Sequence, residues 1–263
     1  MLERVTKEKI MKKNYTIKCI IEDEFNNKKT ETTVISAKSK EKAISKLEKM
    51  YSDYYIEEIH SIKKEPVVGL VVLRGQCVHN GHVALVDKMF KECDLVIIGL
   101  GSTQEHSTIN NPWKPKDRKT MWEKIYGKTG KYSKLKIIEL RDIGAVSKIS
   151  WASYVFGKIE GVNLPRPTHY YAGSKHDASW FSIMNEEFGK DTIQIRILDR
   201  FSKSLCMSGT EIRKSILDKQ EDWKKYVPEV IVDFVEETFP KELMLYENID
   251  VDKEKTSFEK RKG

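Results

Sequence analysis

Two histidines stand three positions apart in the segment His79-Asn80-Gly81-His82, and imidazoles at this spacing beside a glycine can bind phosphate. The apolar run before them predicts a buried parallel strand, and the apolar spacing after them predicts a helix over 81–91. Both imidazoles would then lie where open α/β sheets bind ligands and where helix N–H groups attract phosphate. Gly81 would let the backbone approach a triphosphate closely. The competing interpretation is a pair of surface histidines at a helix start, one of them acting as a cap.

Three other segments follow predicted strands and should lie at the same edge of the sheet. They are the polar loop 101–113, the segment 171–175 and the segment 208–213. Gly173 could sit close to a nucleobase, although a glycine after a strand is common. Ser208 or Thr210 could cap a helix, and Arg213 would then emerge one turn later, within reach of a phosphate. Each segment alone also fits an ordinary loop or cap, but together with the histidine pair they favour a phosphate site.

Predicted strands and helices alternate from residue 67 onward, which implies an α/β fold with a Rossmann-like, doubly wound parallel sheet. Strands are predicted at 68–74, 94–100, 135–140, 168–172 and 192–198, and helices at 81–91, 115–127, 150–159, 176–188, 209–218 and 222–238. Before them, alternating segments at 15–21, 30–35 and 55–62 and a helical segment at 39–51 predict a small ββαβ module.

Three regions are therefore expected along the chain. They are an accessory module over 1–63, a larger domain over 67–242 and a charged, disordered tail over 247–263. The accessory module contains no glycine-rich loop and no cluster of ionisable residues. We expect it to serve assembly or partner docking rather than chemistry.

The composition of the 263 residues is that of a folded protein, since 39% of them are hydrophobic and no apolar run is long enough to cross a membrane. We therefore expect no membrane partner. The four cysteines lack metal-ligand spacing, so we also expect reduced thiols, a cytoplasmic location and no metal held by protein ligands. A net charge of +7 could indicate a nucleic-acid partner, but the lysines are interleaved with acids along the chain. The charge would also attract small polyanionic substrates, and nucleic acid is the less favoured partner.

Seven segments, in order, resemble motifs of the H-x-G-H nucleotidyltransferases, specifically the archaeal-type nicotinamide mononucleotide adenylyltransferases. The segments are Leu73-Arg-Gly-Gln-Cys-Val-His-Asn-Gly-His82, Gly101-Ser-Thr-Gln-Glu-His-Ser-Thr-Ile-Asn-Asn-Pro-Trp113, Lys116-Asp-Arg118, Trp151, Ala172-Gly-Ser174, Ser208-Gly-Thr-Glu-Ile-Arg213 and Asp222-Trp-Lys-Lys-Tyr-Val-Pro228. They lie within 68–240 at nearly the family's spacing, whereas the first 63 residues lie outside the resemblance.

The resemblance implies transfer of AMP from ATP to nicotinamide mononucleotide, which gives NAD and pyrophosphate. It assigns His82 as the donor to the α-phosphate, His79 as a phosphate ligand beside it, and Arg213 as the holder of the leaving phosphates. Its ATP-binding set also includes Arg74, Gln76, Gly173, Ser208 and Thr210. Mg²⁺ is expected to bind through the ATP phosphates and to keep most of its waters. Because the acceptor phosphate is already an anion, alignment and charge neutralisation would carry the reaction.

The resemblance also implies a mononucleotide site formed by Ser102, Gln104, Asn110 and Trp151. Trp151 would stack on the nicotinamide ring, and its alternative is a core tryptophan at a helix start. Asn110 stands where some family members have an arginine that bonds the mononucleotide phosphate. Cys77 replaces a family proline and Gly75 a larger residue, so the first loop should be looser.

Other functions stay open at this point. The acceptor could be nicotinic acid mononucleotide, FMN, phosphopantetheine or another phosphorylated small molecule, although the segments 208–213 and 222–228 favour the pyridine-nucleotide branch. From different classes, the chain could be a catalytically weakened nucleotide sensor or a nucleic-acid binder acting through its ββαβ module. The family also implies a homo-oligomer.

Overall fold

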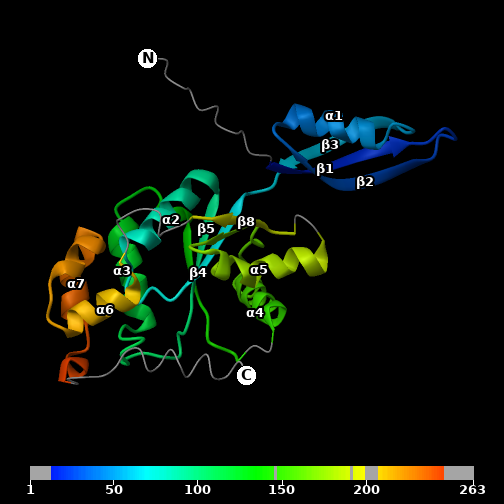
Figure 1. Cartoon of the computed structure of the whole chain (residues 1–263). Coiled ribbons are helices and arrows are strands. Elements are labelled where there is room, and N and C mark those ends of the chain that lie inside the picture. The colour runs from blue at the N-terminus through cyan, green and yellow to red at the C-terminus, as the bar shows by residue number, and fades with distance from the viewer. Residues whose placement is uncertain (1–12, 145–146, 190–191, 199–206, 246–263) are drawn as a thin grey trace, which may run out of the picture. The chain divides into compact units, whose positions relative to one another are not determined.

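A computed structural model describes residues 13–144, 147–189, 192–198 and 207–245 and divides the chain into two compact units. The first unit extends to Val67 and the second begins at Val68 (Figure 1). Each unit encloses a hydrophobic core of its own. The predicted tail at 247–263 lies outside the described residues.

The first unit is an antiparallel sheet of three strands with one helix packed on it. β1 (Lys13–Glu22) lies between β2 (Lys28–Ala37) and β3 (Tyr55–Lys64). Alternate side chains of β1, Ile17, Cys19 and Ile21, are fully buried in one core with Leu47 of α1 (Lys40–Met50). Ser39 accepts a hydrogen bond from the backbone N–H of Lys42 and so caps α1. The predicted ββαβ module is confirmed.

The second unit is built on a parallel sheet of five strands in the order β6-β5-β4-β7-β8. The strands are β4 (Val68–Leu73), β5 (Leu95–Leu100), β6 (Leu135–Glu139), β7 (His169–Ala172) and β8 (Gln194–Ile197). The four pairings between neighbouring strands are all parallel, so the predicted Rossmann-like sheet is confirmed. The strand order changes direction between β4 and β7, and a crevice forms at such a switch point beyond the carboxyl ends of the strands.

Helices cover both faces of this sheet, which explains why its strands are apolar on both sides. On one face, α4 (Lys148–Glu160) and α5 (Lys175–Phe188) share a core with Leu70 and Tyr170. α2 (Asn80–Glu92) packs against the other face of the sheet. A Cβ at Gly69 would lie 2.7 Å from Sγ of Cys93, so glycine is what lets the end of α2 approach β4 this closely.

The remaining elements are helical, and one of them corrects the sequence-based expectation. They are α3 (Pro115–Tyr126), α6 (Gly209–Leu217), α7 (Val232–Thr238) and 3-10 turns at Tyr132–Lys134, Asp222–Tyr226, Glu229–Ile231 and Lys241–Leu245. The single helix predicted over 222–238 is wrong. Pro228 has no N–H and excludes Val227 from the helical region, so the chain forms two short turns before α7 begins.

None of the helices within the described ranges has the length and hydropathy needed to cross a membrane.

Candidate functional site

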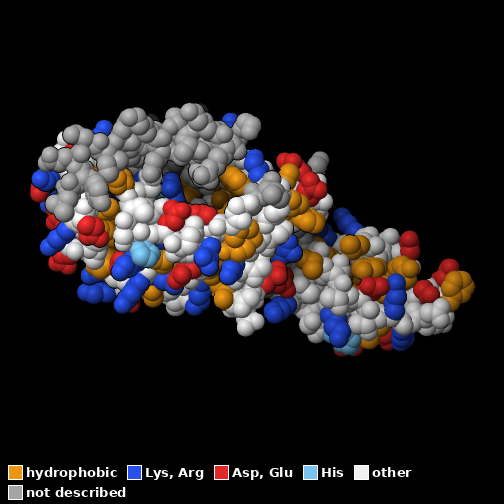
Figure 2. Space-filling view, turned by 90° about the horizontal axis from the view of Figure 1, so that it is seen from below, with side chains coloured by type: hydrophobic (Ala, Val, Ile, Leu, Met, Phe, Trp, Pro, Cys, Tyr) orange, Lys and Arg blue, Asp and Glu red, His pale blue; other side chains and the backbone are white. Residues whose placement is uncertain are grey.

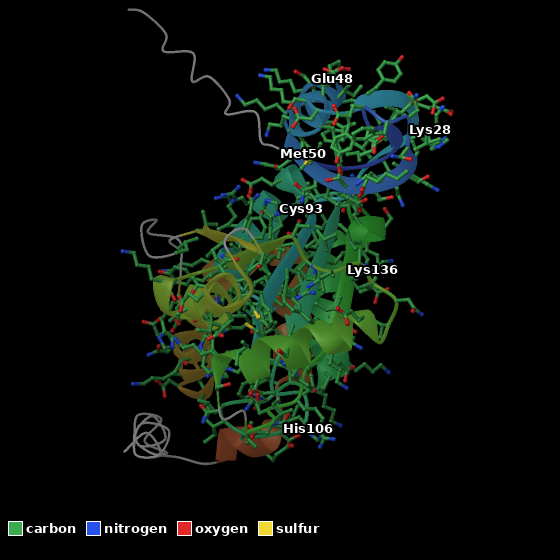
Figure 3. The ribbon with its side chains drawn as sticks, turned by 90° about the vertical axis from the view of Figure 1, so that its right-hand side faces the viewer. Lys28, Glu48, Met50, Cys93, His106 and Lys136 are labelled. Carbon is green, nitrogen blue, oxygen red and sulfur yellow. The ribbon has the colours of Figure 1, made fainter. Side chains whose placement is uncertain are left out.

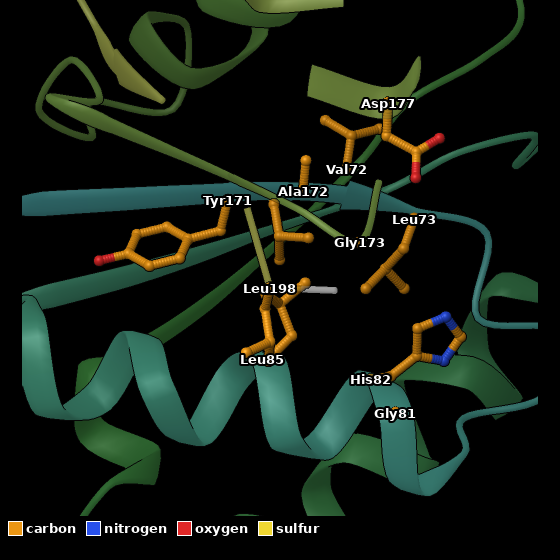
Figure 4. Close-up of a pocket in the computed structure, with 11 residues that line it drawn as sticks. Val72, Leu73, Gly81, His82, Leu85, Tyr171, Ala172, Gly173, Asp177 and Leu198 are labelled. Carbon is orange, nitrogen blue, oxygen red and sulfur yellow. The ribbon is translucent and has the colours of Figure 1, made fainter. Parts of the chain in front are cut away.

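The carboxyl ends of β4 and β7 border a pocket at the switch point of the sheet (Figure 4). Its walls come from β4, the start of α2, β7, the start of α5 and the segment after β8. The described lining residues are Val71, Val72, Leu73, Gly81, His82, Leu85, Tyr171, Ala172, Gly173, Asp177 and Leu198. The pocket therefore joins the histidine motif to Gly173, two features that lie about ninety residues apart in the sequence.

The histidine pair lies at the amino end of α2, as its setting in the sequence predicted. The rings of His79 and His82 stack with centroids 3.7 Å apart, and His79 is buried whereas His82 is half-buried. The backbone N–H of His79 donates to Nδ1 of His82 at 3.4 Å, which helps to fix the second ring. The His82 ring thus borders the pocket, and the buried His79 ring stacks on it.

Arg213 projects from the first turns of α6 toward the loop that carries the histidines. Its Nη1 donates to the carbonyl of Gln76 at 2.5 Å, and its Nη2 donates to Oγ1 of Thr210 at 3.2 Å. Only 4% of Arg213 is exposed, and burial, assisted by the positive charge of Arg74, lowers the pKa of its guanidinium to about 10. Its Nε has no hydrogen-bond partner among the described residues. A buried cation of this kind is suited to an incoming anion.

α6 can approach this loop because its first residue is glycine. A Cβ at Gly209 would lie 2.9 Å from the carbonyl oxygen of Gln76, which is closer than real Cβ contacts. Ser208 caps the helix by accepting from the N–H of Glu211, whose carboxylate accepts from the N–H of Ser208 in return. The Ser208 hydroxyl is thus occupied by the cap, while Thr210 contacts Arg213.

The side-chain amide of Gln76 is used inside the protein. Its Nε2 donates to the carbonyl of Trp113 at 3.0 Å, and its Oε1 accepts from the N–H of Trp113 at 2.9 Å. Gln76 and Trp113 are both buried, so this pair of bonds fixes the first loop to the end of the 101–113 loop. In the structure as it stands, Gln76 contributes to the site by holding two loops together.

Gly75 and Cys77 flank Gln76 and are the two residues of the first loop that depart from the motif it resembles. Gly75 has a φ of +60°, a conformation in which glycine has no steric cost. Cys77 is fully buried, and burial raises the pKa of its thiol to about 12, so the thiol stays neutral. Both residues are buried in the structure, and the looser loop expected from them stays a prediction.

Arg118 is a residue whose role the sequence reasoning missed. It is completely buried on α3, and its Nη1 donates to the carbonyl of Arg74 at 2.6 Å and to that of Gly101 at 2.8 Å. These carbonyls directly follow β4 and β5, so Arg118 connects the starts of both loops. Burial is the main cause that lowers its pKa to about 10. In the sequence, Arg118 stood out only as part of the Lys116-Asp-Arg118 motif, which does not say which groups its side chain contacts.

Three arginines therefore converge on the carboxyl edge of the sheet. Arg74 is exposed, whereas Arg118 and Arg213 are buried. The charge of Arg74 contributes to the lowered pKa of both buried guanidinium groups, so Arg74 lies within electrostatic range of each of them. Such a cluster is unfavourable without an anion and suits a ligand that carries several negative charges.

The loop after β5 contains the predicted mononucleotide residues. Ser102 is buried with a φ of +51°, and Gln104 exchanges two hydrogen bonds with Asp142 in the segment after β6. Asn110 is half-buried in the same loop. Figure 3 places His106 of this loop at the opposite end of the second unit from Cys93, which lies two residues before the start of β5. The loop thus lies at the carboxyl edge, as predicted.

Trp151 lies on the first turn of α4, apart from the histidine pocket. Its ring is half-buried against the core, with the centroid of Tyr154 5.4 Å away. The Tyr154 hydroxyl accepts from the N–H of Arg141 at 3.0 Å, next to Asp142, the partner of Gln104. Trp151 is therefore linked only through Tyr154 to the segment that bonds Gln104, and its half-buried ring also suits the core interpretation.

The described residues contain no group of three or more His, Cys, Asp or Glu side chains arranged to hold a metal ion. On the face seen in Figure 2, lysine and arginine side chains are interspersed with aspartate and glutamate. In contrast to these mixed surface charges, Arg74, Arg118 and Arg213 form a group of like charges at the carboxyl edge of the sheet.

Comparison with known proteins agrees with this geometry. Residues 76–243 match the model of the cytidylyltransferase-like family. The chain is 30% identical over 172 residues to a nicotinamide-nucleotide adenylyltransferase of Thermococcus onnurineus, covering 65% of this chain and 83% of that protein. It is 32% identical over 166 residues to the same enzyme of Methanococcus vannielii, covering 63% of this chain and 86% of that protein.

A solved structure shares the fold. It is a bifunctional NMN adenylyltransferase/ADP ribose pyrophosphatase from Francisella tularensis, complexed with AMP and a manganese ion. The TM-score is 0.54 at 17% identity, and the match covers 68% of this chain. The chain spans about half the length of that protein, 52% of it. From the matched family model, the parallel sheet and the histidine pair at its switch point, the chain belongs to the cytidylyltransferase-like family of nucleotidyltransferases.

Proposed function

We propose that the chain is a nicotinamide mononucleotide adenylyltransferase, which transfers AMP from ATP to nicotinamide mononucleotide and releases pyrophosphate. The observation that carries the proposal is the stacked pair His79 and His82 at the start of α2, together with the buried Arg213, which bonds the loop just before them. The relatives named above, which carry this activity in their names, support the choice of both substrates.

In this proposal, the pocket residues hold ATP and the charges around them stabilise the transition state. His82 donates to the α-phosphate while negative charge builds on its oxygens, and His79 supports that ring. Arg213, held by Thr210 and by the carbonyl of Gln76, receives the leaving pyrophosphate. The phosphate of the mononucleotide is the nucleophile and needs no general base, so alignment supplies most of the rate.

The acceptor is assigned to the loop after β5. Ser102, Gln104 and Asn110 would contact the mononucleotide, with Trp151 stacked on its ring. The contacts of two residues favour placing the acceptor at this loop. Gln76 and Arg118 attach the loop to the ATP-binding loop through buried hydrogen bonds, so both substrates would be held in one rigid frame.

Mg²⁺ would enter with the triphosphate and neutralise part of its charge. The pocket contributes a single carboxylate, Asp177, among its described lining residues, so phosphate oxygens and water would supply the ligands. The related Francisella structure contains AMP and a manganese ion.

The proposal is tested by incubating the protein with ATP, Mg²⁺ and one of several acceptors. The panel comprises nicotinamide mononucleotide, nicotinic acid mononucleotide, FMN and phosphopantetheine, and chromatography measures pyrophosphate and the dinucleotide product. We expect NAD with the first acceptor at the highest kcat/KM. Product only with FMN or phosphopantetheine would overturn the acceptor assignment, and absence of pyrophosphate with all four would overturn the activity.

A further inference from the structure

We infer that Asp177 reads the nucleobase of the bound nucleotide, by accepting a hydrogen bond from its exocyclic amino group. The inference rests on the proposed function for the phosphate end of the pocket. It assigns the other end of the pocket, and it names the side chain that would make the site selective for a base with an amino substituent.

Asp177 has an unusual place among the residues that line the pocket. Most of the described lining side chains are aliphatic or glycine, and the polar ones are His82, Tyr171 and Asp177. The Tyr171 hydroxyl is already engaged, since it donates to Oε2 of Glu92 at 2.6 Å. His82 and Asp177 therefore remain as the side chains that can orient a ligand by hydrogen bonding, which is the usual composition of a selective apolar pocket.

The carboxylate of Asp177 is held in place by the start of α5. The Ser174 hydroxyl donates to its Oδ2 at 2.8 Å, and the N–H of Asp177 donates back to Oγ of Ser174 at 3.1 Å. No described residue donates to Oδ1 of Asp177, so this oxygen can accept from a ligand. A fixed carboxylate loses little conformational entropy on binding and favours one ligand geometry.

Charge decides which part of a nucleotide faces Asp177. Phosphates bound near His82 and Arg213 would be repelled by a carboxylate, so the triphosphate cannot extend toward Asp177. Gly173 lies between His82 and Asp177 in Figure 4, and without a side chain it leaves room for a flat ring. A nucleotide with its phosphates at His82 therefore directs its base, past Leu73 and Gly173, toward Asp177.

A carboxylate accepts hydrogen bonds and donates none, so it distinguishes amino from oxo substituents. The 6-amino group of adenine would donate to Oδ1, whereas the 6-oxo group of hypoxanthine would place two acceptors against each other. A hydrogen bond to a charged group is worth about ten- to a hundredfold in affinity. ATP should therefore bind more tightly than ITP by about that factor.

The test measures binding of ATP, ITP and dATP to the full-length protein by calorimetry, without an acceptor. We expect the ATP preference over ITP to fall to within about threefold in Asp177→Asn, whose amide can either accept or donate. Asp177→Ala should lose the preference as well and serves as a second variant if the first unfolds. Glu187→Gln is the matched control, because it makes the same carboxylate-to-amide change at an exposed position of α5, and its ATP preference should persist.

Three results would overturn the inference. They are equal binding of ATP and ITP by the natural protein, an unchanged ATP-to-ITP ratio in both Asp177 variants, and a loss confined to the ATP-to-dATP ratio, which would assign Asp177 to the ribose. Failure of the proposed function looks different, because the protein would then bind ATP with the expected preference but form no NAD.

Discussion

The two units of this chain differ in what they bury. The core of the first unit consists of hydrophobic side chains such as Ile17, Ile21 and Leu47, and no polar or charged residue is buried among its described positions. The described buried polar residues all fall in the second unit, and they are Gln76, His79, Ser102, Asn111, Arg118, His169, Arg213 and Ser215. Burying such groups costs free energy unless they are hydrogen-bonded, so their concentration in one unit suggests that they serve a functional site there.

Most of these buried groups lie around the carboxyl edge of the sheet. Gln76, Arg118 and Arg213 each donate to backbone carbonyls of the loops that follow β4 and β5. Long side chains with several donors can fix two chain segments at once, which an aliphatic residue cannot do. The comparison teaches that the second unit buries polar and charged groups around a positively charged site, whereas the described core of the first unit is apolar and holds no such groups.

The largest effect should come from His82→Ala. Removing one transition-state donor should lower kcat by about a hundred- to a thousandfold, while the affinity for ATP changes far less. Steady-state kinetics and ATP calorimetry measure the two quantities. His176→Ala, an exposed histidine at the start of α5, is the control and should behave like the natural protein. Near-normal turnover in a folded His82 variant would refute the proposed mechanism.

A smaller effect, shared by both substrates, is expected for Arg118→Met. The substitution leaves the carbonyls of Arg74 and Gly101 without their shared donor, so unfolding free energy should fall by about 1–3 kcal/mol. The kcat/KM for ATP and for the mononucleotide should fall together, about tenfold, as the loops lose their connection.

Arg118→Lys keeps a donor at this place and should recover part of the loss. Lys116→Met, an exposed change on the same helix, controls for effects of charge. A variant that melts earlier yet keeps both kcat/KM values would reduce Arg118 to a purely structural residue.

Trp151→Ala separates the two interpretations of that side chain. If the ring stacks on the pyridine, the KM for the mononucleotide should rise about three- to tenfold while ATP binding stays nearly the same. If the ring belongs to the core, thermal stability should drop and both substrates should be affected alike. Kinetics with each substrate varied, beside a melting curve, distinguishes the outcomes.

The smallest effect is expected when the first unit is removed. A fragment of residues 64–263 should stay folded and keep its kcat and its affinity for ATP, because the described buried polar groups all lie within it. If the full-length protein is an oligomer and the fragment is a monomer, that result would still agree with this expectation, because the first unit is expected to serve assembly. A folded, monodisperse fragment that no longer binds ATP would instead show that the first unit takes part in the site.

The fold and the histidine motif could be predicted because their signals are local. Periodicity locates the strands, and His79, Gly81 and His82 are three residues apart or fewer, so the strand-to-helix setting fixes their place. The one misplaced element, 222–238, had a visible signal in Pro228, which the helical pattern around it obscured.

The supporting contacts could not be predicted because they join distant parts of the chain. Arg118 lies 44 residues from Arg74, and Gln76 lies 37 residues from Trp113. Their hydrogen bonds depend on how the strands are arranged, which periodicity does not encode. For the same reason, Asp177 drew no attention in the sequence, since its meaning depends on Gly173 and His82 bordering one pocket.

The central claim, nucleotidyl transfer at the histidine pocket, is tested most directly by following the phosphates of ATP. The natural protein is incubated with nicotinamide mononucleotide, Mg²⁺ and ATP radiolabelled at either the α- or the γ-phosphate, and the products are separated. Attack at the α-phosphorus predicts that the α-label enters NAD and that the γ-label leaves entirely in pyrophosphate. Transfer of the γ-label to the acceptor, or an α-label that never leaves ATP, would contradict the account.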